Sequence, residues 1–222
     1  METNMNQKET YWHSEAPKYH WAHSRLKLIA ETIRGDASIK SVLDIGAGSG
    51  TLAHLLGRDI RYLGLDITGR KEPDDQWPPI RFCDFDDAES FSSLLDQPFD
   101  AVVISGVLEY LKDWRGILRV AARQGLKANG MLLVSAIYFP FYETFPMKRH
   151  PAWINRFVPA DIRAALADND LRLDVTYPMW AGGYPWTASL SRALSRRGQS
   201  THPSWIHWMG VNQFLFVCHR EK

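Results

Sequence analysis

The chain has 222 residues, of which 45% are hydrophobic and 23% are charged, a composition that excludes a wholly disordered, collagenous or coiled-coil protein. Its 26 basic and 25 acidic residues leave a formal net charge of +1, so no overall charge attracts it to nucleic acid or to an anionic membrane. The longest apolar stretches, 101–108 and 131–141, fall well short of the roughly 20 residues that span a bilayer. We therefore expect a soluble protein whose partner is a small molecule, with no nucleic-acid or membrane partner.

The start of the chain and its cysteines indicate a compartment. Residues 1–17 are polar and contain no apolar segment of the kind found in a secretory signal. Only two cysteines occur, Cys83 and Cys218, which is too few for a disulfide framework. We expect a cytoplasmic protein, whose oligomeric state the sequence does not indicate.

Apolar residues recur at helical spacing over 18–34, between the polar tail and Gly35. The sequence thus predicts a tail and a cap helix over 1–40, followed by one domain over 41–222.

Short apolar runs closed by Gly, Asp or Pro alternate with helical stretches from residue 41 onward. They are 41–46, 61–67, 80–85, 99–106, 130–138, 171–177 and 214–219. Their continuous apolar character is typical of strands buried on both faces, as in a parallel sheet covered by helices. The pattern predicts an α/β fold with seven strands.

The regular alternation ends after Tyr138. Two long segments, about 140–160 and 180–211, are rich in Pro, Trp and Tyr and flank a helix that should begin near Pro159. Connections longer than about 12 to 15 residues in a compact domain are usually functional or disordered. We expect these segments to be irregular insertions that form a lid over the site, together with the helix at 18–34.

Residues 42–56 carry a glycine-rich turn between a strand and a helix. The strand runs into Gly46, Gly48 and Gly50, which allow a tight turn and a close approach to a ligand beside helix amides. The next strand ends in Asp66, whose carboxylate can accept both hydroxyls of a ribose. The pattern predicts an adenosine-containing cofactor.

Two such cofactors compete, a nicotinamide dinucleotide and S-adenosylmethionine. The dinucleotide fingerprint requires a third small residue at position 51, where the chain has Thr51. This departure favours S-adenosylmethionine, although an NAD-dependent oxidoreductase stays open.

Four motifs in order carry a family resemblance: the turn at 42–56 with Asp66, RFCDFDD at 81–87, VLEYL at 107–111, and GLKANGMLLVS at 125–135. The chain resembles the class I S-adenosylmethionine-dependent methyltransferases, in particular the small-molecule group whose helix after the fourth strand reads V-L-E-H-L. The resemblance implies a Rossmann-like three-layer αβα sandwich with a seven-stranded, mostly parallel sheet whose last strand is antiparallel. It also implies methyl transfer from S-adenosylmethionine to O or N of a small molecule; a non-catalytic protein that binds this cofactor is the alternative.

The resemblance implies cofactor contacts at the ends of four strands. Gly46, Ala47, Gly48 and Gly50 would contact the methionine part, and Asp66 and Ile67 would contact the ribose and adenine. Asp84 and Phe85 would contact the adenine amino group and ring, and Ser105 and Gly106 would lie against the sulfonium. We expect Asp44 to orient the glycine turn and Glu109 to cap or pair within its helix. Asp84 has a second reading, since acidic residues often start a solvated helix.

The sequence motifs say less about which residues bind the methyl acceptor. Candidate acceptor contacts are Tyr138, His150, Trp153 and Trp186, and candidate bases, should one be needed, are His150, His202, His207 and Tyr138. Basic residues at 148–150 and 192–197 suggest an anionic acceptor. No metal is expected, because Ser105 stands where metal-dependent catechol methyltransferases place an Asp and the histidines lack zinc-site spacing.

Overall fold

The computed structural model describes residues 24–69, 77–145, 152–180, 187–197 and 209–221. Within these ranges, eight strands form one sheet in the order β3-β2-β1-β4-β5-β8-β6-β7. The strands are β1 (Ser41–Ile45), β2 (Arg61–Asp66), β3 (Ile80–Phe82), β4 (Phe99–Ser105), β5 (Leu126–Ile137), β6 (Leu171–Met179), β7 (Arg196–Arg197) and β8 (Gln213–Arg220).

Strands β1 to β5 are parallel, whereas β8 runs antiparallel between β5 and β6. All seven expected strands and the antiparallel last strand are confirmed, and the two-residue β7 adds an edge.

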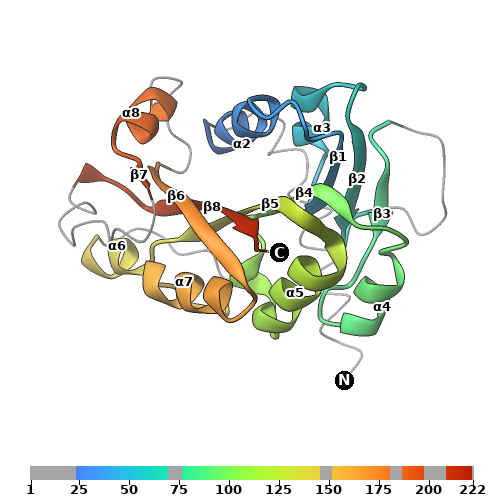
Figure 1. The fold of residues 1–222 in the computed structure, drawn as a ribbon. Coiled ribbons are helices and arrows are strands. Elements are labelled where there is room, and N and C mark those ends of the chain that lie inside the picture. The colour runs from blue at the N-terminus through green and yellow to red at the C-terminus, as the bar shows by residue number, and fades with distance from the viewer. Residues whose placement is uncertain (1–23, 70–76, 146–151, 181–186, 198–208, 222) are drawn as a thin grey trace.

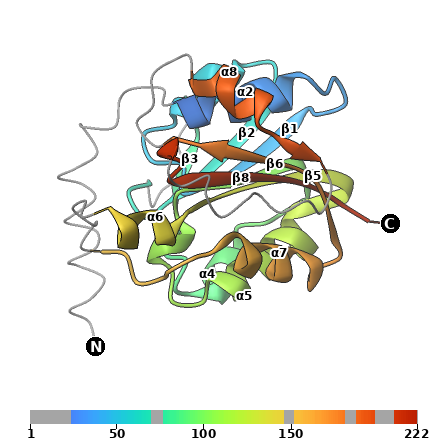
Figure 2. The same ribbon diagram turned by 90° about the vertical axis from the view of Figure 1, so that its left-hand side faces the viewer.

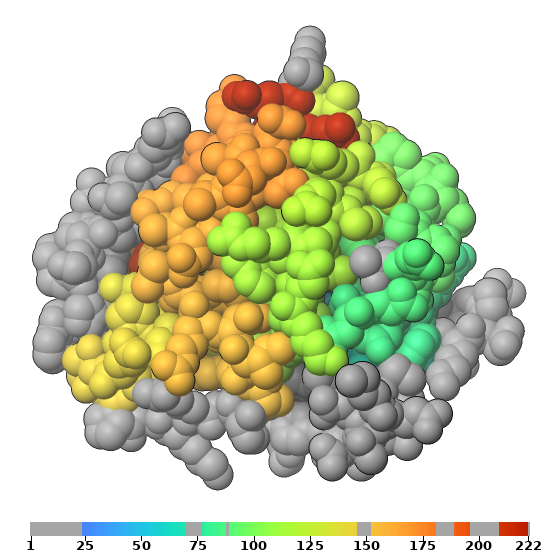
Figure 3. Space-filling model, turned by 90° about the horizontal axis from the view of Figure 1, so that it is seen from below, coloured from blue at the N-terminus to red at the C-terminus, as the bar shows by residue number. Residues whose placement is uncertain are grey.

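Helices cover both faces of the sheet in three layers (Figures 1 and 2). One face carries α2 (Ser24–Arg34), α3 (Thr51–Leu56) and α8 (Thr187–Ala193). The other carries α4 (Ala88–Ser93), α5 (Trp114–Val120), α6 (Phe139–Thr144) and α7 (Pro159–Ala167), which lie together in the view from below (Figure 3). No helix of the described ranges combines the length and the apolar character that crossing a membrane requires.

Both faces of the central strands are buried under helices, which explains their continuous apolar sequence. Leu43 of β1 and Val102 of β4 pack into the cluster under α5, while their chain neighbours Val42 and Val103 pack into the cluster with α2 and α3. Side chains alternate across a strand, so each residue of such a run enters one core or the other.

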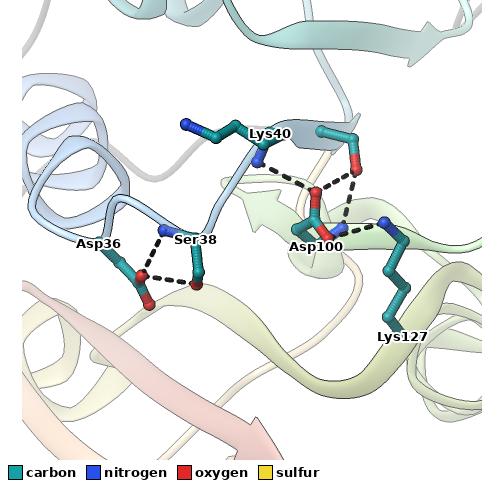
Figure 4. Close-up of polar contacts among 6 residues, drawn as sticks. Asp36, Ser38, Lys40, Asp100 and Lys127 are labelled. Carbon is teal, nitrogen blue, oxygen red and sulfur yellow. Dashed lines mark hydrogen bonds and ion pairs between the residues drawn. The ribbon is translucent and has the colours of Figure 1, made fainter.

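Asp100 joins the amino ends of three central strands (Figure 4). Its carboxylate accepts hydrogen bonds from the Lys40 amide (3.0 Å), the Ser41 hydroxyl (2.7 Å) and the Lys127 ammonium (2.7 Å). Partial burial raises the pKa of Asp100, but the bonds from Lys127, Ser41 and Lys40 outweigh it and hold the pKa below its usual value. The network lies at the end of the sheet opposite the carboxyl ends of the parallel strands.

Two local expectations are wrong, and a third is confirmed over the part that the structure describes. The VLEYL segment forms only a 3-10 turn, η2 (Leu108–Tyr110), because Asp113 caps the next helix by accepting a bond from the Gly116 amide, and α5 therefore begins at Trp114. The segments expected to be irregular contain α6 and α8. The helix expected over 18–34 is described from Ser24 onward, and its first six residues lie outside the described ranges.

Candidate active site

A cavity of about 280 Å³ opens where the carboxyl ends of β1, β2 and β4 meet. Strand order reverses between β1 and β4, and such a crevice is where open α/β sheets bind ligands. All but one of the predicted cofactor residues line it: Asp44, Gly46, Ala47, Gly48, Asp66, Ile67, Asp84, Phe85, Ser105 and Gly106. The exception is Gly50, which starts α3 and is buried against Pro78 outside the cavity lining.

The turn after β1 is held close to the neighbouring strands. The amides of Gly46 and Ala47 both donate to the Leu65 carbonyl, at 2.8 and 3.1 Å. A Cβ on Gly46, which has φ +78°, would lie 2.9 Å from the Cβ of Val107. Only glycine fits this conformation and this approach, so the backbone amides of the turn border the cavity.

Asp66 fixes the glycine turn. One carboxylate oxygen accepts from the Gly48 amide at 2.8 Å, and the other accepts from the amide and hydroxyl of Thr68 at 2.9 and 2.7 Å. These bonds use three of the roughly four acceptor positions of a carboxylate. Accepting two ribose hydroxyls would therefore displace Thr68 or Gly48.

Asp44 of β1 also lines the cavity and is only 3% exposed. It accepts a 2.6 Å bond from the Tyr62 hydroxyl, and no contact of the described residues links it to the glycine turn. Burial raises the pKa of Asp44 to about 7, against the lowering effect of the Tyr62 bond. The orienting role expected of Asp44 thus belongs to Asp66, and Asp44 is a buried, titratable group of the cavity.

Arg25 of α2 also lines the cavity. Its guanidinium lies on Gly106: a Cβ built there would be 3.0 Å from both terminal nitrogens. Burial raises the pKa of Asp44 and of Glu109, and the charge of Arg25 partly opposes this rise in both. Nothing in the sequence singles out this arginine, because one basic residue in an amphipathic helix is normally solvated.

The acidic run after β3 divides into two roles. Asp87 caps α4 by accepting bonds from the amides of Glu89 and Ser90. Asp84 lines the cavity and accepts a 3.0 Å bond from the Asp86 amide, while Phe85 is buried edge to face against Phe91. The helix-start reading therefore applies to Asp87, three residues beyond Asp84.

The aromatic acceptor candidates lie behind the cavity wall. Tyr138 is buried against Phe214 and does not belong to the cavity lining. Trp153 packs on Tyr142 and donates from its indole nitrogen to the hydroxyl of Tyr110, a lining residue, at 3.0 Å. His150, Trp186, His202 and His207 lie outside the described residues.

Polar groups that the sequence did not assign to the site lie at the carboxyl end of β5. Glu109, 1% exposed, accepts from the Ile137 amide at 2.7 Å through Oε1, so it links its turn to β5. Burial raises the pKa of Glu109, although its own amide, the Ile137 amide and the charge of Arg25 lower it. Gln213, the first residue of β8, is 1% exposed and lines the cavity.

The described lining of the cavity has more acidic than basic groups, whereas the basic residues 148–150 lie outside the described residues, so an anionic acceptor stays a prediction. Among the described lining residues, four carboxylates, Asp44, Asp66, Asp84 and Asp86, face a single cation, Arg25. Arg192, one of the basic residues expected to bind an anion, pairs instead with Glu31 of α2. The described ranges hold no group of three His, Cys, Asp or Glu side chains suited to a metal, and the absence of a metal stays a prediction.

Solved structures of low sequence identity share this fold. The N-methyltransferase NodS from Bradyrhizobium japonicum WM9 is 14% identical over 89% of this chain and 86% of that one, with a TM-score of 0.56. The 1,6-didemethyltoxoflavin-N1-methyltransferase of Burkholderia thailandensis is 14% identical over 98% and 87%, with a TM-score of 0.58. A chain of the complex between the Haloferax volcanii Trm112 activator and a methyltransferase is 19% identical over 89% and 91%, with a TM-score of 0.58. The protein has the fold of class I S-adenosylmethionine-dependent methyltransferases.

One sequence family matches part of the chain. Residues 43–132 match the family described as "Methyltransferase domain", which covers the glycine turn through the start of the β5 core. The resemblance inferred from the motifs is confirmed, and the comparisons support a methyltransferase with S-adenosylmethionine as its cofactor. Among curated proteins, no sequence matches the chain.

Proposed function

We propose that the protein transfers the methyl group of S-adenosylmethionine to a nitrogen or oxygen of a small molecule by direct displacement. The observation that carries this proposal is the single cavity in which the glycine turn, Asp66 and Asp84 share one space with Tyr110, Ile137 and Gln213. When bound, S-adenosylmethionine supplies an electrophilic methyl group on a positively charged sulfur. The acceptor's lone pair forms the new bond to carbon as the carbon–sulfur bond breaks and its electron pair stays on sulfur.

The residues of the cavity fit this cofactor from end to end. In this proposal Asp66 binds the ribose and Asp84 binds the adenine amino group, and both line the cavity. Arg25 offers a guanidinium for the methionine carboxylate, and the buried Asp44 offers a carboxylate for the ammonium beside it. The excess of carboxylates favours a ligand with a sulfonium over one with a neutral or anionic centre.

The protein's own contribution is alignment and the exclusion of water. Val107, Leu111 and Ile137 give the cavity an apolar border beyond Ser105 and Gly106. An apolar border keeps water from the reacting atoms, and a bound acceptor would be held in line with the methyl group. Two of the similar solved structures are N-methyltransferases, which supports a small-molecule acceptor here.

Calorimetry and labelling together test the proposal. We expect S-adenosylmethionine and S-adenosylhomocysteine to bind in the presence of a chelator, with no comparable binding of NAD. Incubation with a metabolite extract and deuterated S-adenosylmethionine should give products that carry the heavy methyl group. Preference for NAD would favour an oxidoreductase, and cofactor binding without any labelled product would favour the non-catalytic alternative.

A further inference from the structure

Two buried side chains near one end of the cavity each have one polar atom without a hydrogen-bond partner. The second carboxyl oxygen of Glu109, Oε2, is fully enclosed and has no partner among the described residues. The amide oxygen of Gln213, Oε1, is in the same condition, and Gln213 is a lining residue of the cavity. Most buried polar atoms in proteins are paired, because leaving one unpaired is costly.

The two groups flank one residue. The amide of Ile137 donates to Oε1 of Glu109, and Ile137 is the register partner of Gln213 across the β5–β8 ladder. Residues opposite each other in an antiparallel pair lie about 5 Å apart at their Cα atoms. Since Ile137 and Tyr110, the residue after Glu109, both line the cavity, Glu109 lies directly behind its wall.

Both unpaired atoms are hydrogen-bond acceptors, so a ligand that satisfies them must bring two donors. A hydroxyl group brings one donor, whereas a primary amine brings two N–H groups and keeps its lone pair. With both N–H groups held by the wall, that lone pair is free to point at the methyl group.

We propose that Gln213 in the cavity wall and Glu109 directly behind that wall form the acceptor subsite, and that the acceptor is a primary amine whose two N–H groups they bind. This inference rests on the proposed function and narrows it to N-methylation. It also assigns Glu109 a task in the reaction itself. The nitrogen becomes positive as its bond to the methyl carbon forms, and a buried carboxylate beside it stabilises that charge.

The charge of the site agrees with this assignment. The residues that face Glu109 are Arg25, Ile137 and Tyr142, and the cavity as a whole has more carboxylates than cations among its described lining residues. An amine that becomes an ammonium on methylation suits this field, whereas a phosphate or carboxylate acceptor would be repelled.

The test uses two variants that each remove one of the unpaired acceptors. Glu109→Gln keeps an acceptor for the Ile137 amide and loses the charge. Gln213→Leu replaces the amide by an apolar group of similar size. The control is Met179→Leu, since Met179 is buried, pairs with Gln213 in register on β6 and does not line the cavity.

Each variant is measured in three ways: thermal unfolding, S-adenosylhomocysteine binding by calorimetry, and transfer of a deuterated methyl group to a metabolite extract. Derivatisation of the labelled products distinguishes N-methyl from O-methyl compounds. We expect N-methyl products and a loss of about tenfold or more in their rate of formation for both variants. S-adenosylhomocysteine affinity should stay within about twofold. The unfolding midpoint should be unchanged or raised, in Gln213→Leu because an unsatisfied buried amide has been removed and in Glu109→Gln because a buried charge has been replaced by a neutral amide. The control should match the parent protein in all three.

The outcomes separate the inference from the function. O-methyl products, or N-methyl products formed as fast by both variants as by the parent, would overturn the inference and leave methyl transfer standing. A lowered unfolding midpoint in both variants would show that these side chains support the fold and would also overturn it. Binding of S-adenosylhomocysteine by the parent with no labelled product would overturn the proposed function, and the inference with it.

Discussion

Replacing Asp44 by Asn should make the ligand-free protein more stable, and increasingly so as the pH rises. Burial in the cavity wall raises the pKa of Asp44 from 3.8 to about 7. Each unit corresponds to about 1.4 kcal/mol, so ionised Asp44 lowers the free energy of unfolding by about 4 kcal/mol above neutral pH. Asn is uncharged at every pH and can still accept the Tyr62 hydrogen bond.

The sign follows from proton binding. Between the unfolded pKa of 3.8 and the folded pKa of about 7, the folded protein holds the Asp44 proton and the unfolded chain does not. The stability contributed by this group is therefore complete below the lower value and is lost as the pH rises through the higher one. From about pH 5.5 to about pH 8.5, the stability advantage of Asp44→Asn over the parent should grow by about 2 kcal/mol.

Urea unfolding of the parent and of Asp44→Asn at both pH values measures this difference. Asp100→Asn provides a control of opposite sign, because its hydrogen bonds hold the pKa of Asp100 below the usual value. Its loss of stability should be present at neutral pH and should shrink as the pH falls through that lowered pKa. An advantage of Asp44→Asn that stayed constant or declined with rising pH would refute the argument that burial controls this carboxyl.

Three further expectations concern cofactor binding and the stability of the sheet. Asp66→Ala should weaken S-adenosylhomocysteine binding about tenfold or more, because charge-assisted bonds to ribose are lost while the sheet stays folded; calorimetry with an undiminished affinity would show that Asp66 does not hold the ribose. Arg25→Gln should weaken S-adenosylhomocysteine about tenfold but leave 5′-methylthioadenosine, which has no aminocarboxylate, unaffected; an equal loss for both ligands would mean that Arg25 acts through the packing of α2. Asp100→Asn should lower the free energy of unfolding by about 1 to 2 kcal/mol near neutral pH, measured in urea, through the lost bond to the Lys127 ammonium.

The features that the sequence predicted are local ones. The glycine turn, Asp66 and Asp84 each follow directly on a strand, and parallel strands deliver their carboxyl ends to one edge of the sheet. Once the strands were identified, the position of these groups followed from chain direction alone. The same reasoning left the roles within the acidic run open, because Asp84 and Asp87 are both plausible helix caps and only the start of α4 decides between them.

The features that it missed depend on tertiary approach. Arg25 reaches Gly106 only because α2 packs across the sheet, and Tyr62 meets Asp44 from the adjacent strand β2. The aromatic residues after Tyr138 were poor guides, since a buried aromatic ring packs a core as readily as it binds a ligand. Tyr138 and Trp153 do the former here, with Phe214 and Tyr142 as their neighbours.

Because β8 runs antiparallel, the cavity is lined by residues from two distant parts of the sequence. The lining residues from Asp44 to Gly106 follow parallel strands and lie in one continuous stretch of sequence. Gln213 reaches the same cavity from the beginning of a strand more than one hundred residues later, because that strand runs the other way. Changes of sequence or length between β6 and β8 alter the far wall and leave the first stretch untouched. Proteins with this topology can therefore change their methyl acceptor through the second part while the residues of the cofactor site stay the same.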